Sequence, residues 1–256
     1  MIWESIEETS QITAGLILSI MDLILAIYTM GLMMVSFASS RDMTSKCSFD
    51  KKILRVTCRN LKEFPTNINE NATSLEITNS VLNSTTLENI DLPKKISKLI
   101  IRGCNLKTIG RFKQNKILTE LVISNFKDVK PGAFDNLINL KHLDLNIGEI
   151  TSFPLFNTKF MDLKILSLRG NKITELKKEH LQKFPNLIEL FLESNKFTIL
   201  KNGMFPEINK IKLLKMSNNP ITSIESRAFE NLRNLKVLIL DNINIENLPT
   251  KGLKGL

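Results

Sequence analysis

The sequence predicts an α/β solenoid: a curved stack of short coils with a parallel β-sheet on the concave side and irregular or short helical segments on the convex side. Three observations lead to this fold class. One apolar motif recurs at a nearly constant spacing, its central residues alternate as in a short strand, and an asparagine falls at the same turn of several copies. Because one such coil cannot bury its own apolar face, neighbouring coils must stack around a continuous core.

The motif reads L-x-x-L-x-L-x-x-N-x-L and is clear in residues 187–197, "LIELFLESNKF". Neighbouring copies are separated by 22 to 24 residues, which keeps all of them in register. The eight copies begin at Ala72, Ile96, Leu118, Leu140, Leu163, Leu187, Ile211 and Leu235. We therefore expect eight coils of similar length.

The fourth and sixth positions of each copy are apolar, as at Leu190 and Leu192, and their neighbours face outward. Asn171, Asn195 and Asn219 occupy the ninth position. A buried amide at this turn can bond the backbone of adjacent coils, so stacked copies would form a polar ladder. Cys104 stands in the same slot, where we expect a buried and inert thiol.

Four copies depart from the motif at the ninth position. The residues there are Ser80, Phe126, Gly148 and Ile243. In three of these copies an asparagine stands one place early, at Asn79, Asn125 and Asn242. We therefore expect the ladder to be broken or bulged at these coils.

Residues 1–40 contain no Lys or Arg, and residues 12–38 are almost continuously apolar. This segment is long enough to span a bilayer, but it ends in small residues at 36–38, "SFA", which are typical of a signal-peptide cleavage site. We predict a signal peptide over residues 1–38, with a retained signal anchor as the alternative.

Two further features fit a secretory route. Cys47 and Cys58 lie eleven positions apart, a spacing that suits a disulfide in an oxidising compartment. Asn71 and Asn83 each begin an N-x-[ST] sequon, so both are candidate glycosylation sites.

The repeats and the cysteine-bearing segment together resemble the leucine-rich repeat family, in its typical extracellular class. The resemblance implies a linker and an N-terminal cap over residues 39–70, followed by about eight repeats over residues 71–256. Family caps often carry four cysteines, so the cap is expected to be a shortened variant. No closing cysteine cap follows the last repeat, and since an open end exposes apolar core we expect a fragment of a longer protein.

Outward-facing strand positions are free of the packing demands of the fold, and apolar residues gather there in the second half of the array. Since adjacent strands lie about 4.8 Å apart, these side chains can form one concave patch that binds a protein ligand or a second copy of the chain. The alternative is that strand propensity alone favours them. The apolar members are Ile165, Phe191, Leu213, Val237 and Ile239, and the charged rim is Arg169, Glu193, Lys215 and Asp241.

The formal net charge is +9, and without the four acids of residues 1–40 it rises to +13. Cations on the outer halves of the coils would coat the convex or lateral surface. Such a surface can attract a sulfated glycan or an anionic lipid surface, whereas nucleic acid is not expected in the secretory compartment. These cations include Arg111, Lys113, Lys116, Lys177, Lys178, Lys183, Lys201 and Lys210.

His142, Asp144 and Ser167 share the predicted concave face and are a possible base, acid and nucleophile. However, residues 142 and 144 would project about 7 Å apart along one strand, and no glycine-rich elbow accompanies them. Zinc, P-loop and dinucleotide motifs are absent from the sequence. We expect no catalytic residues, no metal and no cofactor, and keep a hydrolase-like enzyme as a remote alternative.

The sequence therefore predicts a secreted or cell-surface protein that binds other proteins without catalysis. The family resemblance implies roles in adhesion, matrix organisation or ligand recognition. The alternative is the ectodomain fragment of a single-pass receptor, including the innate-immune type, whose membrane span and signalling part lie beyond Leu256. Membrane contact is expected only if such a span exists or the N-terminal segment is retained.

Overall fold

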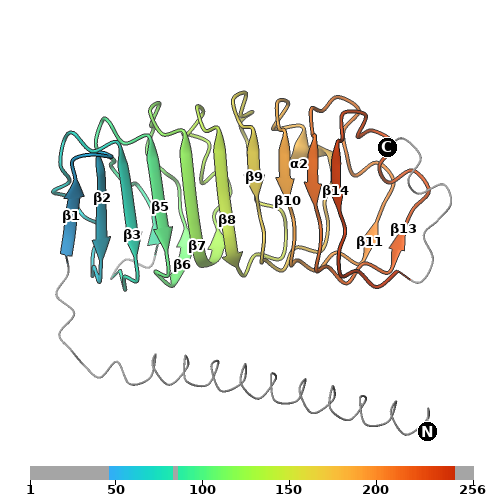
Figure 1. Cartoon of the computed structure of the whole chain (residues 1–256), viewed down its shortest axis with the longest axis horizontal. Helices are drawn as coiled ribbons and strands as arrows, with labels where there is room; N and C mark the ends of the chain where they lie inside the picture. The colour runs from blue at the N-terminus through green and yellow to red at the C-terminus, as the bar shows by residue number, and fades with distance from the viewer. Residues whose placement is uncertain (1–45, 83–85, 246–256) are drawn as a thin grey trace, which may run out of the picture. The chain divides into compact units, whose positions relative to one another are not determined.

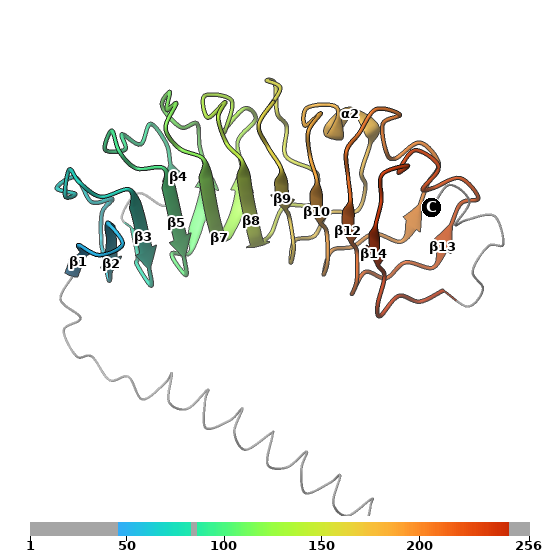
Figure 2. The same ribbon diagram turned by 45° about the horizontal axis from the view of Figure 1, so that its top comes forward.

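The computed structural model describes residues 46–82 and 86–245, which form a curved solenoid of stacked coils (Figures 1 and 2). Each coil contributes one strand to a long sheet, and the strands lie side by side in an arc. The main path of this sheet is β1 Lys46–Asp50, β2 Arg55–Arg59, β3 Ser74–Thr78, β5 Lys98–Arg102, β7 Glu120–Val129, β8 His142–Gly148, β9 Ile165–Ser167, β10 Glu189–Phe191, β12 Leu213–Lys215 and β14 Val237–Ile239.

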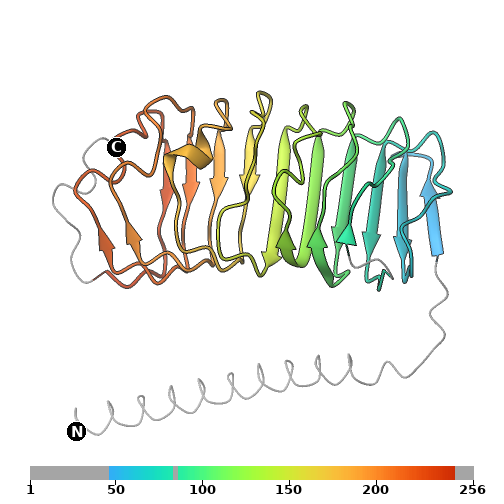
Figure 3. The same cartoon turned by 180° about the vertical axis from the view of Figure 1, so that it is seen from behind.

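Four shorter strands and one helix lie in the return segments of the coils. β4 Thr86–Leu87 pairs with β6 Leu106–Ile109, and β11 Ile199–Leu200 pairs with β13 Ser223–Ile224. The helix is α2 Lys178–Leu181. Figure 3 shows these irregular segments from behind the main sheet. The predicted solenoid with a parallel concave sheet is thus confirmed, with α2 as the helical contribution within the described residues.

All neighbouring pairs on the main path are parallel except β1 with β2. The register is the one that the motif demands, since Leu166, Leu190 and Leu214 are paired across three coils. Each of these side chains is fully buried. Burying one such leucine contributes about 1.5–3 kcal/mol, so a one-residue slip, which would turn every one of them outward, is strongly disfavoured.

Phenylalanines from the return segments fill the other side of the core. Phe112, Phe134 and Phe156 come from consecutive coils, and their ring centroids are 6.1 and 5.8 Å apart in turn. All three are buried. Tight turns bring these segments back to the sheet, as where the N–H of Leu137 donates to the carbonyl of Phe134 at 2.8 Å. Such short turns close the coil without a long helix.

The asparagine ladder forms where it was predicted. The side-chain amide of Asn195 donates to the carbonyls of Leu168 (2.9 Å) and Leu192 (3.1 Å), and its oxygen accepts from the N–H of Ile173 (3.0 Å). Asn219 repeats the pattern one coil later. Cys104 is buried in the same slot with its sulfur 3.4 Å from the carbonyl of Arg102, and burial raises the pKa of its thiol.

The predicted break in the ladder also occurs, at two adjacent coils. The ring of Phe126 is buried at the ninth position, and Gly148 stands at that position in the next coil. A Cβ on Gly148 would lie 2.5 Å from the Phe126 ring, so only glycine leaves room for it. The buried oxygen of Asn171, one coil further on, has no hydrogen-bond partner within the described range.

The eighth motif position is a left-handed turn, which the sequence reasoning missed. In five copies the N–H of this residue donates to the carbonyl of the next coil's seventh residue, as from Asn79 to Arg102 at 3.1 Å. All eight copies have a φ between 47° and 70° there, at Asn79, Gly103, Asn125, Ile147, Gly170, Ser194, Asn218 and Asn242. Asn79, Asn125 and Asn242, which stand one place before the ninth position, are therefore turn residues. Asn and Gly tolerate this left-handed conformation best.

At the N-terminus, the predicted disulfide between Cys47 and Cys58 forms and joins β1 to β2. The predicted signal segment 1–38, the sequon residue Asn83 and the chain beyond residue 245 lie outside the described residues. Asn71, the first residue of the other sequon, is exposed. None of the helices that the structure describes is long and apolar enough to cross a membrane.

Candidate binding surface

The predicted apolar patch lies on four adjacent concave strands, β9, β10, β12 and β14. Pairing places Ile165, Glu189, Leu213 and Val237 in one row and Ser167, Phe191, Lys215 and Ile239 in the next. Apolar and polar side chains alternate along the second row, whereas the first row has one polar residue, Glu189, between Ile165 and Leu213. Phe191 meets Ile165 and Leu213 diagonally, a separation of about 7–8 Å that an aromatic side chain can bridge.

Phe191 is half-buried, and the ammonium of Lys215 lies 5.4 Å from its ring centroid. This cation–π contact holds Lys215 across the patch rather than at its rim. Val237 is 41% exposed, and Ile165, Leu213 and Ile239 are each half-buried. The face is thus amphipathic, with apolar surface available between fixed charges.

The other predicted rim residues lie where the strands end. Arg169 and Asp241 are exposed, whereas Glu193 is half-buried and its Oε2 atom lacks a hydrogen-bond partner among the described residues. The backbone N–H of Asp241 donates to the hydroxyl of Ser217 at 3.0 Å. These three residues border the patch on one side.

Asp144 occupies the centre of the concave face, on β8, and is a candidate that the patch prediction did not include. Its Oδ1 atom is buried without a hydrogen bond in the part of the chain that the structure describes. Burial raises the pKa of this carboxyl to about 6, although Arg102 and Arg169 act in the opposite direction. A partner that donates a hydrogen bond would satisfy this oxygen. The sequence contains a signal for this site: at the fifth motif position, two copies with apolar residues, Ile100 and Val122, are followed by one with an acid, Asp144.

A row of charges leads to Asp144 along the third positions of the coils. The ammonium of Lys98 lies 2.7 Å from Oε1 of Glu120, and Nδ1 of His142 lies 3.7 Å from the same oxygen. Burial lowers the pKa of His142, and Glu120 partly offsets the effect. The imidazole is therefore mainly neutral at pH 7.

The possible catalytic grouping does not assemble. The hydroxyl of Ser167 is buried and donates to Oδ1 of Asn146 at 2.7 Å, not to an imidazole. A serine nucleophile needs a base within hydrogen-bond reach. This geometry gives no support to the hydrolase-like alternative. Within the described residues there is also no cluster of His, Cys, Asp and Glu suited to a metal ion.

Ile147 stands out at the edge of this face, where β8 ends. Its φ is 54° and its side chain is 66% exposed. A β-branched residue in a left-handed turn is rare and costs about 1–2 kcal/mol, yet the other seven copies use Asn, Gly or Ser here. Strain of this kind collects at functional positions, which makes Ile147 a candidate contact residue.

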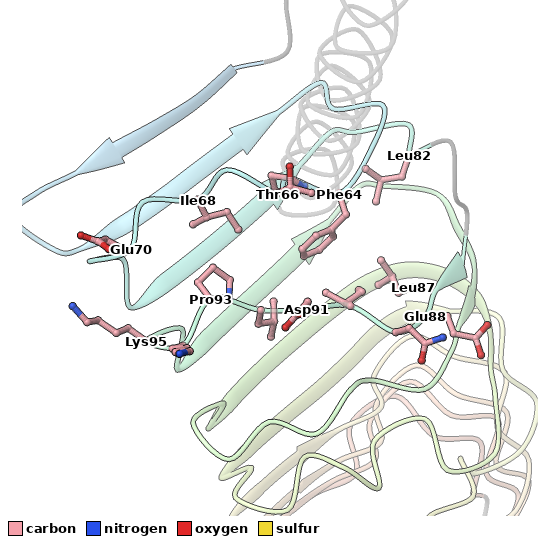
Figure 4. Close-up of a pocket in the computed structure, with 15 residues that line it drawn as sticks. Phe64, Thr66, Ile68, Glu70, Leu82, Leu87, Glu88, Asp91, Pro93 and Lys95 are labelled. Atoms are coloured by element: carbon pink, nitrogen blue, oxygen red, sulfur yellow. The ribbon is translucent and has the colours of Figure 1, made fainter.

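A separate groove lies outside the concave face, between the cap and the first coils (Figure 4). Phe64 and Ile68 lie on one wall, and Leu87 and Pro93 lie on the other. Its volume is about 790 Å³. It contains none of the predicted patch residues.

The model of the family described as "Leucine rich repeat" matches residues 162–221. This is the stretch that holds the unbroken asparagine ladder. Residues 162–221 thus match the leucine-rich repeat family, and the described part of the chain has the leucine-rich repeat fold. Solved structures agree, with TM-scores of 0.66 for human 5T4 (Wnt-activated inhibitory factor 1, trophoblast glycoprotein) and 0.54 for the Leptospira interrogans LRR protein LIC12759.

The coverage of these leucine-rich repeat neighbours differs. The 5T4 match is 21% identical and covers 78% of this chain and 80% of that chain, whereas the LIC12759 match is 22% identical and covers 77% and 57%. These identities indicate a shared fold. A TLR13 structure in complex with ssRNA13 matches at 26% identity and a TM-score of 0.61, over 72% of this chain and 27% of that chain.

A curated relative is the "Probable glycoprotein hormone G-protein coupled receptor" of Anthopleura elegantissima. It is 30% identical over 159 residues, which are 59% of this chain and 17% of the receptor. The leucine-rich repeat array described here thus spans about a sixth of that relative's length. Its similarity is to one part of a receptor.

Proposed function

We propose that this leucine-rich repeat protein is a non-catalytic binding protein whose concave face holds a protein ligand or a second copy of the chain. The observation that carries the proposal is the amphipathic surface on β9, β10, β12 and β14, centred on Phe191 and Lys215. Aromatic and aliphatic anchors beside charges are typical of binding hot spots. Asp144 and Ile147 extend the proposed surface to the middle of the array.

The proposed setting is extracellular or at the cell surface. The disulfide between Cys47 and Cys58 is consistent with an oxidising compartment, and the matched receptors support the same setting. In this proposal residues 1–38 direct secretion, residues 39–70 are the linker and cap, and Asn71 and Asn83 carry glycans. Mass spectrometry of the natural N-terminus and of both sequon peptides tests these assignments.

The second candidate is the ectodomain part of a leucine-rich repeat receptor with its membrane span and signalling part elsewhere. The similarity to a hormone receptor and to TLR13 supports it. An antibody against the repeats, used on medium and membrane fractions before and after glycan removal, separates the two. A soluble band of about the size of this chain without its first 38 residues favours the secreted protein, and a larger membrane-bound band favours the receptor.

Phe191→Asp tests the concave face directly, and Ile208→Asp is its matched control because Ile208 is 86% exposed in a return segment. The probe is a panel of purified extracellular domains that includes the chain itself. We expect binding partners of the native chain to lose affinity at least tenfold with Phe191→Asp and to keep it with Ile208→Asp. Equal binding by a folded Phe191→Asp variant would exclude the patch.

A further inference from the structure

A second surface lies at the edge of the main sheet where the strands begin, away from the proposed protein-binding patch. We define this strand-start edge as the four residues directly before each strand from β3 onward on the main path. It holds nine cations and two acids. The cations are Lys94, Lys95, Lys116, Lys141, Lys164, Lys210, Lys212, Arg233 and Lys236, and the acids are Glu70 and Asp162.

The fold places these cations along one edge of the sheet, and it aligns four of them, Lys141, Lys164, Lys212 and Lys236, at the second motif position. At the second motif position, the backbone N–H of each coil donates to the carbonyl of the coil before it. The bond from Lys164 to Lys141 is 2.8 Å, and that from Lys236 to Lys212 is also 2.8 Å. Because all the strands involved are parallel, every one of these segments lies at the same edge (Figure 1). The edge from Lys95 to Lys236 crosses six inter-strand steps of about 4.8 Å, so it is about 29 Å long.

These cations are not neutralised by neighbours. Among the described residues, none of the nine takes part in an ion pair, and all except Lys164 are exposed. Several cations of the return segments are paired, as Lys113 with Asp91 and Lys130 with Glu88. Within the described residues, the strand-start edge therefore carries nine cations without an ion pair, and they include Lys116 and Lys210, which the sequence assigned to the outer halves of the coils.

We propose that the strand-start edge binds a linear sulfated polysaccharide. An edge that carries nine cations and only two acids over this length matches a polymer with repeated anionic groups. The disulfide supports an extracellular polyanion rather than RNA, and the strip carries no aromatic side chain on which bases could stack. Its narrow linear form also fits a polymer better than a membrane surface.

The test is the salt concentration at which the protein elutes from immobilised heparin, with affinity then measured against salt. The variant is Lys141→Gln, Lys212→Gln and Lys236→Gln together. The control is Lys107→Gln, Lys127→Gln and Lys196→Gln, which removes three exposed lysines without ion pairs from other parts of the coils. Both variants have the same net charge.

We expect the strip variant to elute at clearly lower salt than the control, and its slope of log affinity against log salt to fall by about two. Equal elution of the two variants would overturn the proposal, because binding would then follow net charge alone. Stronger competition by a single-stranded RNA or by anionic vesicles than by heparin, at equal charge, would also overturn it. Phe191→Asp should leave heparin elution unchanged, so this result is independent of the concave patch.

Discussion

Replacing Gly148 with alanine should destabilise the protein. The opposite would be expected from the conformational entropy of the unfolded chain, which glycine increases. The φ of Gly148 is not in the left-handed region, so Gly148→Ala would ordinarily stabilise by about 0.4–1 kcal/mol through the unfolded state. Here the new Cβ would lie 2.5 Å from Cζ and 2.6 Å from Cε2 of the buried Phe126 ring, and would also meet Oδ1 of Asn171. Overpacking of this kind costs about 1–3 kcal/mol.

Equilibrium unfolding in urea measures the change as a shift of the midpoint at constant slope. A double-mutant cycle with Phe126→Ala supplies the control. Phe126→Ala alone should cost about 3–5 kcal/mol, and Gly148→Ala should cost at least about 1 kcal/mol less in that background, since the ring contact is gone while the contact with Asn171 remains. Stabilisation by Gly148→Ala in the native background, or strict additivity in the cycle, would refute the steric reasoning.

Three other substitutions test the remaining elements. Asn195→Ala should lower the free energy of unfolding in urea by about 2–4 kcal/mol, because the buried N–H of Ile173 loses its acceptor. Hydrogen exchange should then show faster exchange at Ile173. A loss below about 1 kcal/mol would contradict the ladder. Ile147→Asn should raise stability by about 0.5–1 kcal/mol by relieving the left-handed isoleucine, and unchanged or lower stability would argue against strain. The pKa of Asp144 in the folded protein is raised to about 6, so the native chain should lose stability relative to Asp144→Asn as pH rises from about 4 to about 6. Stability profiles of the two proteins that run parallel over this pH range would show that the pKa of this carboxyl is not raised.

The sequence was sufficient for every feature that depends on the repeat period. Leu166, Leu190 and Leu214 are paired and buried as the motif requires, and Asn195 and Asn219 make the expected ladder bonds. These features are predictable because one period fixes both which side chains face the core and which residues become neighbours. The disulfide was predictable from spacing and context alone.

Other features depend on contacts between coils, which one copy of the motif does not reveal. The left-handed turn at the eighth position accompanies a bond to the carbonyl of the next coil, as from Ile147 to Arg169 and in four equivalent copies. Two other features also depend on contacts between coils. Lys215 lies over the ring of Phe191, and Lys113 forms an ion pair with Asp91. The sequence therefore predicted the concave sheet but not which cations form ion pairs.

Three unusual features occur together in the coil that begins at Leu140. Asp144 has an unpartnered buried oxygen, Ile147 has a left-handed backbone and Gly148 makes room for Phe126. The family match begins only at residue 162, beyond this coil, where the ladder is regular. A natural sequence breaks its local rules mainly where function or strain demands it. Asp144 and Ile147 lie at the surface, whereas Gly148 only makes room for the Phe126 ring. We therefore expect Asp144→Asn and Ile147→Asn to change binding, and Gly148→Ala to change stability alone. Measuring binding and stability for these three variants separates function from strain.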